Sequence, residues 1–194
     1  LQVADNTNFN IFINLKNTDL ITQLLIPKLS IADNSSLSVN LDNPEELKLD
    51  ANFNNITFNN MLINNLSLDA DYNNGLLKNN LTADNFILNK ENNSLDFIDF
   101  SNIKLSNELQ NDTLLLNLSW VDSIFYNNNK INLIANVSDF PNLTINLIDT
   151  NNIYLQHDRW DLSSDGDIKY TPELISVDNL YIKNDTSYIN INGK

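Results

Sequence analysis

The chain has 194 residues, and its 25 acidic and 11 basic side chains give a net charge of −14. This acidity argues against nucleic acid or an anionic lipid surface as a partner, because both require clustered Lys and Arg. With no Cys and one His, the chain lacks the residues for thiolate catalysis, a His-based triad or a metal site with several His ligands. No apolar run reaches the length of a membrane-spanning helix.

The chain contains 40 Asn, 31 Leu and 21 Ile residues but only 3 Gly. A hydrophobic content of 42% is typical of a folded protein and too high for a disordered one. The chain begins at Leu1 and ends at Lys194, directly after a strand-like segment. We therefore interpret residues 1–194 as one segment of a longer protein.

The first predicted element is a short helix near residues 18–26. Apolar residues at Leu20, Ile21, Leu24 and Leu25 have helical spacing, and Pro27 provides a stop. Two to three turns are not stable alone. The helix is therefore expected to lie on the apolar face of a sheet.

From residue 47 onward the apolar residues recur at every second position. This alternation predicts strands with one apolar and one polar face, which is typical of antiparallel sheets. The predicted strands cover residues 47–53, 56–58, 66–72, 114–120, 131–137 and 143–147. The sequence Leu-x-Leu-Asp-Ala-x-aromatic occurs at residues 47–53 and again at residues 66–72, which indicates stacked repeats in an elongated body.

Asn and Asp clusters separate these strands and predict turns, because both residues tolerate left-handed backbone where Gly is absent. The predicted turns are Asn54-Asn55, Asn59-Asn60, Asn73-Asn74-Gly75, Asn92-Asn93, Asn127-Asn128-Asn129 and Asp165-Gly166-Asp167. The overall prediction is an all-β fold with a curled antiparallel or mixed sheet. A sandwich of two sheets that cover one another remains an alternative.

Three features suggest chemistry, and each has a simpler interpretation. His157 could be a base or a ligand, but an ordinary residue at a strand end is favoured because it has no partner set. The sequence Asp165-Gly166-Asp167 resembles the start of a calcium loop but lacks the further oxygen ligands of an EF-hand. The acids Asp69, Asp71, Asp96 and Asp99 could form a glycosidase pair, but a solvated outer face is the simplest interpretation.

Five stretches of the chain have a recognisable pattern: residues 17–32, residues 47–70, Asp158-Arg-Trp-Asp-Leu162, Ile175-Ser-Val-Asp-Asn-Leu180 and Ile189-Asn-Ile-Asn-Gly193. These stretches resemble segments of bacterial TamB proteins of the Bacteroidetes type, which are related to AsmA-like proteins. All are hydrophobic patterns and none is a catalytic signature. TamB is the inner-membrane subunit of the translocation and assembly module.

The resemblance implies a U-shaped sheet, or β-taco, with an apolar groove that carries phospholipid between the inner and outer membranes. It also implies support of outer-membrane protein assembly and secretion with a TamA/BamA-class partner, which would bind outside these residues. The segment would be periplasmic, part of an inner-membrane-anchored protein, non-enzymatic and without cofactor or metal. The expected groove residues are Leu47, Leu49, Phe53, Leu66, Leu68, Tyr72, Leu114, Leu116, Leu118, Trp120, Ile131, Leu133, Val137, Leu143, Ile145 and Leu147.

Two other functions remain open at this point. A right-handed β-helix that acts on polysaccharide would have parallel coils and Gly at its corners, but only three Gly are present. An adhesin or surface-layer β-sandwich would be a pure interaction module. A segment of a longer sheet would also expose unpaired strand edges, so edge-to-edge self-association is a further expectation.

Overall fold

A computed structural model describes residues 8–16, 18, 22, 26, 28–43, 45–89, 97–148, 150–155 and 157–194. The described chain is all-β, and its 15 strands belong to one sheet in which every described pair of neighbours is antiparallel. The prediction of an antiparallel all-β fold is confirmed. These antiparallel pairs differ from the parallel coils of a β-helix.

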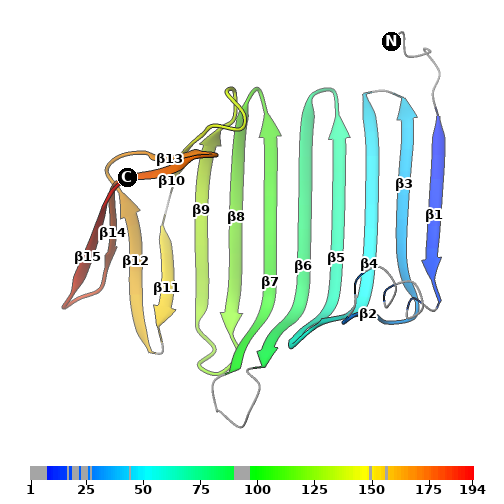
Figure 1. The fold of residues 1–194 in the computed structure, drawn as a ribbon, viewed down its shortest axis with the longest axis horizontal. Helices are drawn as coiled ribbons and strands as arrows, with labels where there is room; N and C mark the ends of the chain where they lie inside the picture. Colours follow the sequence, from blue (N-terminus) through cyan, green and yellow to red (C-terminus); the bar gives the residue numbers. More distant parts are fainter. Residues whose placement is uncertain are drawn as a thin grey trace. The chain divides into compact units, whose positions relative to one another are not determined.

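The chain divides into two compact units, Leu1–Lys104 and Leu105–Lys194, which are described separately below. In the first unit, β1 pairs with β3, and β3 to β6 follow one another in chain order (Figure 1). The short β2 pairs with the far end of β4. The strands are β1 (Phe9–Leu15), β2 (Leu29–Ile31), β3 (Ser35–Asn43), β4 (Glu46–Phe58), β5 (Met61–Asn73), β6 (Leu76–Asn89) and the start of β7 (Phe97–Gln110).

In the second unit, β8 and β9 form a hairpin, and β9 also pairs with two further strands. One end of β9 pairs with β10 and the other with β11, and β14 pairs with both β12 and β13. Besides the end of β7, the strands are β8 (Thr113–Asp122), β9 (Asn128–Asn136), β10 (Leu143–Leu147), β11 (Asn151–Leu155), β12 (Asp158–Ser164), β13 (Ile168–Thr171), β14 (Leu174–Lys183) and β15 (Tyr188–Gly193).

The hairpin turns use left-handed Asn and Asp where other proteins often use Gly. Asn59, Asn74 and Asn111 have φ of 50°, 48° and 47°, and each is the first residue after a strand. The predicted turn at Asn59-Asn60 is therefore confirmed, and that at Asn73-Asn74-Gly75 is confirmed at Asn74-Gly75, because Asn73 still belongs to β5. The turn predicted at Asn92-Asn93 lies outside the described residues.

The turn predicted at Asn54-Asn55 is wrong, because both residues lie inside β4. Residues 47–53 and 56–58 are therefore not two strands but parts of one strand of 13 residues. The turn predicted at residues 127–129 is correct only at its start, because Asn128 and Asn129 already belong to β9.

Most of the predicted helix near 18–26 lies outside the described residues. The described part shows two helical hydrogen bonds. The N–H of Thr22 donates to the carbonyl of Thr18 over 2.8 Å, and the N–H of Ile26 donates to the carbonyl of Thr22 over 2.7 Å. The Thr18 hydroxyl donates to the carbonyl of Ile31 over 2.9 Å, which attaches this segment to β2.

Candidate functional site

All sixteen residues predicted for the apolar face are half-buried: none is fully buried and none is fully exposed. Fifteen lie in strands, and Val137 follows directly after β9. Leu47, Leu49, Phe53, Leu66, Leu68 and Tyr72 belong to the first unit, and the other ten belong to the second.

In the first unit, the antiparallel register of β4 and β5 brings the predicted residues together in rows across the sheet. Leu47 lies opposite Tyr72, and Phe53 lies opposite Leu66. The rows continue onto neighbouring strands that the prediction missed, through Leu37, Val39 and Leu41 of β3 and through Ile11 and Ile13 of β1. The alternation of residues 37–41 was a signal that could have identified β3.

In the second unit, the predicted residues form rows across β8, β9 and β10. Leu116 lies opposite Leu133, which in turn lies opposite Leu147. Leu118 lies opposite Ile131. Leu114 and Ile145 lie on either side of Ala135, which pairs with both. Trp120 lies opposite Asn129, and Leu143 lies opposite Tyr170.

The long strands share a corner at which the apolar spacing changes from two residues to three. In β4 the less exposed positions run to Phe53 and resume at Ile56, with the two exposed residues Asn54 and Asn55 between them. The same spacing occurs in β5, β6, β7 and β14, always with Asn directly before the second apolar residue. The five sequences are Phe53-Asn-Asn-Ile56, Ile63-Asn-Asn-Leu66, Ala83-Asp-Asn-Phe86, Phe100-Ser-Asn-Ile103 and Val177-Asp-Asn-Leu180.

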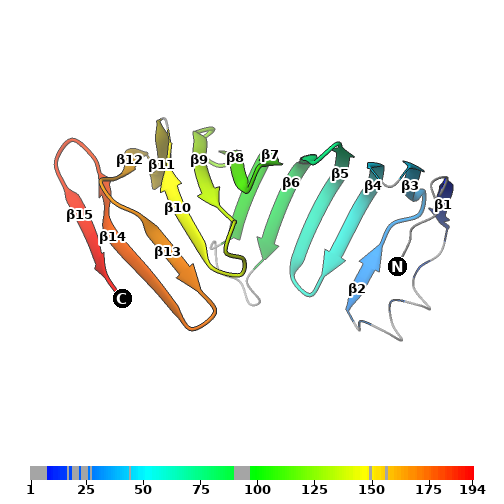
Figure 2. The same ribbon diagram turned by 90° about the horizontal axis from the view of Figure 1, so that it is seen from above.

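Left-handed backbone produces the corner in three of these strands. Asn65, Asn102 and Asn179 have φ of 49°, 50° and 51° in the middle of β5, β7 and β14. An extra residue in a strand bends it and changes which face the next side chain occupies. The register between β4 and β5 does not shift, because both strands have two residues between the pairs Phe53–Leu66 and Ile56–Ile63. Figure 1 shows the lower ends of β5 and β6 bending out of line with the upper parts of the same strands, and Figure 2 shows the strands from above.

Hydrogen bonds along the corner join β5 to β6, and β4 to the segment between β2 and β3. The Asn65 amide donates to the Asp84 carboxylate over 2.7 Å, and the Asn54 amide donates to the Asp33 carbonyl over 3.2 Å. In the second unit, the N–H of Asp165 donates to the carbonyl of Asn179 over 3.3 Å, and the N–H of Asp178 donates to the carbonyl of Asp167 over 3.1 Å. The sequence Asp165-Gly166-Asp167 is thus the same kind of corner, between β12 and β13, and Gly166 fits it because an added Cβ would lie 2.5 Å from the Asp178 carboxylate.

The two faces differ in burial near the corner. On the apolar face, Ala83, directly before the corner of β6, is 5% exposed, and Ala51, two residues before Phe53 in β4, is 3% exposed. On the other face, Asn54, Asn65 and Asp84 are exposed. The apolar face is the more buried one and is called the inner face below, and the polar face is called the outer face.

No second layer of described residues buries the apolar face. The largest fully buried side chains are Asn132, Asn151 and Ser35, all of them polar. The described strands belong to one sheet rather than to two sheets that cover one another. They therefore do not form the predicted alternative, a closed sandwich.

The outer face carries charges in cross-strand pairs. Asp50 lies opposite Asp69, and Asp71 lies opposite both Lys48 and Lys78. The pKa of Asp50 is raised, first because its protonated carboxyl donates a hydrogen bond to Asp69, and then by desolvation and by repulsion from the Asp69 charge. The structure therefore places Asp69 and Asp71 on an exposed strand face, Asp99 is half-buried in β7, and Asp96 lies outside the described residues.

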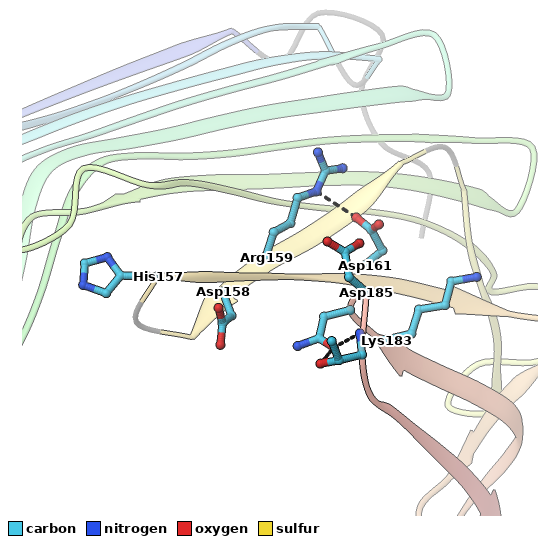
Figure 3. Close-up of a pocket in the computed structure, with 8 residues that line it drawn as sticks. His157, Asp158, Arg159, Asp161, Lys183 and Asp185 are labelled. Carbon is cyan, nitrogen blue, oxygen red and sulfur yellow. Dashed lines mark hydrogen bonds and ion pairs between the residues drawn. The ribbon is translucent and has the colours of Figure 1, made fainter.

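His157 lines a polar cleft of about 540 Å³ in the second unit (Figure 3). Its ring contacts Phe125 edge-on, with 4.4 Å between the ring centres. Arg159 and Asp161 in the same cleft form an exposed ion pair of 2.9 Å. The side chain of Asp161 occupies the face opposite the apolar Leu162, so the cleft belongs to the outer face.

Among the described residues, no three His, Asp or Glu side chains gather closely enough to hold a metal ion. No described helix has the length and apolar character needed to cross a membrane. Comparisons with known protein families, with curated proteins and with solved structures find no match for this chain.

Proposed function

We propose that the apolar inner face binds phospholipid acyl chains and forms part of a non-enzymatic lipid conduit. The observation that carries this proposal is the apolar face itself, which follows the strands around the corner and is only half-buried along its length. Leaving such a surface in water is unfavourable by roughly 25 cal/mol per Å². Acyl chains are long, flexible and apolar, so they suit a continuous face better than a closed cavity.

The division of charge between the two faces supports the same proposal. Along β4 and β5, the rows Leu47–Tyr72 and Leu49–Ala70 contain no charge, whereas the rows that alternate with them are Lys48–Asp71 and Asp50–Asp69. A charge on the inner face would have to be desolvated whenever an acyl chain passed it. On these two strands the four charges therefore lie on the outer face.

The proposal extends to the setting that the TamB resemblance implies. The chain would be a periplasmic segment of an inner-membrane-anchored bacterial protein that moves phospholipid between the inner and outer membranes. It would support outer-membrane protein assembly with a TamA/BamA-class partner bound elsewhere on the longer protein. The hydrophobic patterns of residues 47–70 and 189–193 support this setting, together with the absence of a closed core in the described residues.

Site-specific photo-crosslinking tests the proposal directly. A photoreactive amino acid is placed at Leu133, on the inner face of β9, and in a matched variant at Asn117, on the outer face of β8. Each protein is then incubated with vesicles of radiolabelled phosphatidylethanolamine and irradiated. Crosslinking at Leu133 that exceeds crosslinking at Asn117 is expected. Equal labelling of both faces, or no labelling of either, contradicts the proposal.

A further inference from the structure

The polar cleft of the second unit contains the only His and the only Arg of the chain, His157 and Arg159. It is formed by the start of β12, the end of β14 and the turn from β14 to β15. The other ten basic residues of the chain are all Lys. A guanidinium differs from an ammonium because its five donors form a planar fork that matches the oxygens of a phosphate or carboxylate. The cleft therefore holds the one group of this kind in the chain.

The charged side chains of the cleft are only partly paired with one another. Arg159 donates from Nε to Asp161 over 2.9 Å, and Figure 3 shows its two terminal nitrogens farther from Asp161. Lys183 lies opposite Asp161 on β14 but forms no ion pair with a described residue. Asp158 and Asp185 have no ion-pair partner in the described part of the chain either. The same cleft thus offers free donors and free carboxylates.

The apolar inner face ends at this cleft. Ile153 of β11 lies opposite Trp160 of β12. The next row joins Leu155, which is 54% exposed, to Asp158. Side chains alternate along a strand, so Asp158 is on the inner side of β12 and Arg159 on the outer side, and Figure 3 shows the two pointing in opposite directions. An apolar surface therefore passes into a charged one within the β11–β12 hairpin.

We propose that this cleft holds the zwitterionic phosphoethanolamine headgroup of a phospholipid whose acyl chains lie on the inner face. The inference rests on the proposed binding of acyl chains. The phosphodiester accepts hydrogen bonds from the terminal nitrogens of Arg159 and from the ammonium of Lys183. The ammonium of the headgroup donates to the carboxylates of Asp158 and Asp185. Asp161 positions the guanidinium through its hydrogen bond with Nε.

The mixture of charges in the cleft selects a zwitterion over an ion of either sign. An anionic headgroup, such as phosphoglycerol, leaves Asp158 and Asp185 without a partner and is repelled by them. A purely cationic group leaves Arg159 and Lys183 unsatisfied in the same way. Groups that leave such charges unpaired are rejected, which is a source of specificity. Because hydrogen bonds to charged groups are the stronger ones, loss of the ligand's ammonium is expected to weaken binding about tenfold.

Nuclear magnetic resonance tests the cleft without acyl chains, because a single Arg and a single His each give one assignable side-chain signal. The natural chain is titrated with glycerophosphoethanolamine and with glycerophosphoglycerol, which has a glycerol in place of the ethanolamine. We expect glycerophosphoethanolamine to shift the Arg159 Nε–H and His157 ring signals and to bind about tenfold more tightly. Absence of a shift, or equal affinity for the two compounds, overturns the proposal.

A double variant tests the two carboxylates assigned to the ammonium. Asp158→Asn/Asp185→Asn is expected to bind the two compounds equally. The matched control, Asp71→Asn/Asp112→Asn, removes two exposed carboxylates elsewhere and should keep the tenfold preference. Circular dichroism verifies that each variant keeps its sheet. A cleft variant that keeps the preference, or a control that loses it, overturns the assignment.

Vesicles distinguish a lipid headgroup from a free phosphodiester. Each protein is incubated with vesicles of equimolar phosphatidylethanolamine and phosphatidylglycerol with identical acyl chains, and the lipids retained after gel filtration are quantified by mass spectrometry. Phosphatidylethanolamine should be enriched about tenfold by the natural chain and the control, but not by the cleft variant. Both variants have the same net charge, so general repulsion of phosphatidylglycerol does not explain a difference between them.

The two experiments separate failure of this inference from failure of the proposed function. Retention of both lipids at the vesicle ratio supports acyl-chain binding and overturns the headgroup site. A response to glycerophosphoethanolamine without lipid enrichment assigns the cleft to a free phosphodiester and overturns the lipid headgroup. A chain that retains neither lipid contradicts the proposed binding of acyl chains, and the titration then decides on the cleft alone.

Discussion

Asp50 and Asp69 lie directly opposite each other on β4 and β5, at the centre of the hairpin formed by the two repeated sequences. Each is the fourth residue of a Leu-x-Leu-Asp-Ala-x-aromatic repeat. Because the strands are antiparallel, the first Leu of each repeat lies opposite the aromatic residue of the other, as in Leu47–Tyr72 and Leu66–Phe53. The repeat is thus the two arms of one hairpin, and the predicted stack of strand, short strand and strand is wrong.

The first prediction concerns the pH dependence of this carboxylate pair. The pKa of Asp50 is raised in the folded protein, mainly because its protonated carboxyl donates a hydrogen bond to Asp69, so folding favours the protonated form. Its contribution to stability is present below the raised pKa and is lost as the pH rises through that value. Asp50→Asn should raise the free energy of unfolding at pH 7 by a few tenths of a kcal/mol, since both groups are exposed. Urea unfolding at pH 7 and pH 4 measures this change, and a larger gain at pH 4 would contradict it.

The second prediction concerns the corner. Asn65 has a φ of 49° and its amide donates to the Asp84 carboxylate, so Asn65→Ala loses a hydrogen bond and keeps an unfavourable backbone. A destabilisation of about 1–2 kcal/mol is expected, whereas Asn65→Gly should cost less because Gly adopts this backbone freely. The matched control is Asn55→Ala, at the same level of β4 but without a positive φ. Thermal unfolding of the three variants gives the comparison, and equal losses for Asn65→Ala and Asn55→Ala would contradict the assignment.

The third prediction concerns the buried Asn residues of the second unit. The side-chain carbonyl oxygen of Asn151 accepts a hydrogen bond from the backbone N–H of Asn132, and the side-chain amide of Asn151 donates to the backbone carbonyl of Ile148 over 3.0 Å. Asn151→Ala leaves these buried groups unpaired and should destabilise the fold by about 2–3 kcal/mol. Asn152→Ala, which removes one exposed hydrogen bond to Asn128, should cost less than about 1 kcal/mol. Urea unfolding of both variants tests this difference, and equal losses would show that Asn151 does not hold the strands together.

The strands were predictable up to the corner but not across it. Alternation places Leu47 to Phe53 on one face, and simple continuation would then place Ile56 on the other face. The pairs Asn54-Asn55 and Asn59-Asn60 are the same dipeptide, yet the first lies inside β4 and the second forms the turn to β5. Asn allows left-handed backbone in both settings, so local sequence cannot distinguish them. The pairing of β2 and β3 along the two halves of β4 distinguishes them, and this information is not local.

For the candidate site, the sequence predicted which residues share a face within each half-strand, because period two is a local property. It missed the rows beyond the corner, such as Ile56–Ile63–Phe86, whose phase depends on the bend. It also missed that the buried apolar side chains of the described residues are Ala51, Ala83 and Ala135. Ala51 lies between Leu37 and Leu68, and Ala135 lies between Leu114 and Ile145, so larger neighbours across the sheet cover them.

The central claim is that the inner face holds phospholipid acyl chains, and a single charge on that face tests it most directly. Leu116 lies on the inner face opposite Leu133, and the adjacent Asn117 lies on the outer face opposite Asn132. Leu116→Asp and Asn117→Asp therefore add the same charge one residue apart on opposite faces. Leu116→Asn serves as a neutral second variant, and circular dichroism verifies that each variant keeps its sheet.

The measurement is the amount of phospholipid retained per chain after incubation with vesicles and gel filtration. The natural chain and Asn117→Asp should retain equal amounts. Leu116→Asn should retain less, and Leu116→Asp should retain at least about tenfold less, because an unpaired charge costs several kcal/mol when an acyl chain desolvates it. Folded Leu116→Asp that retains as much phospholipid as Asn117→Asp would contradict the lipid-binding account.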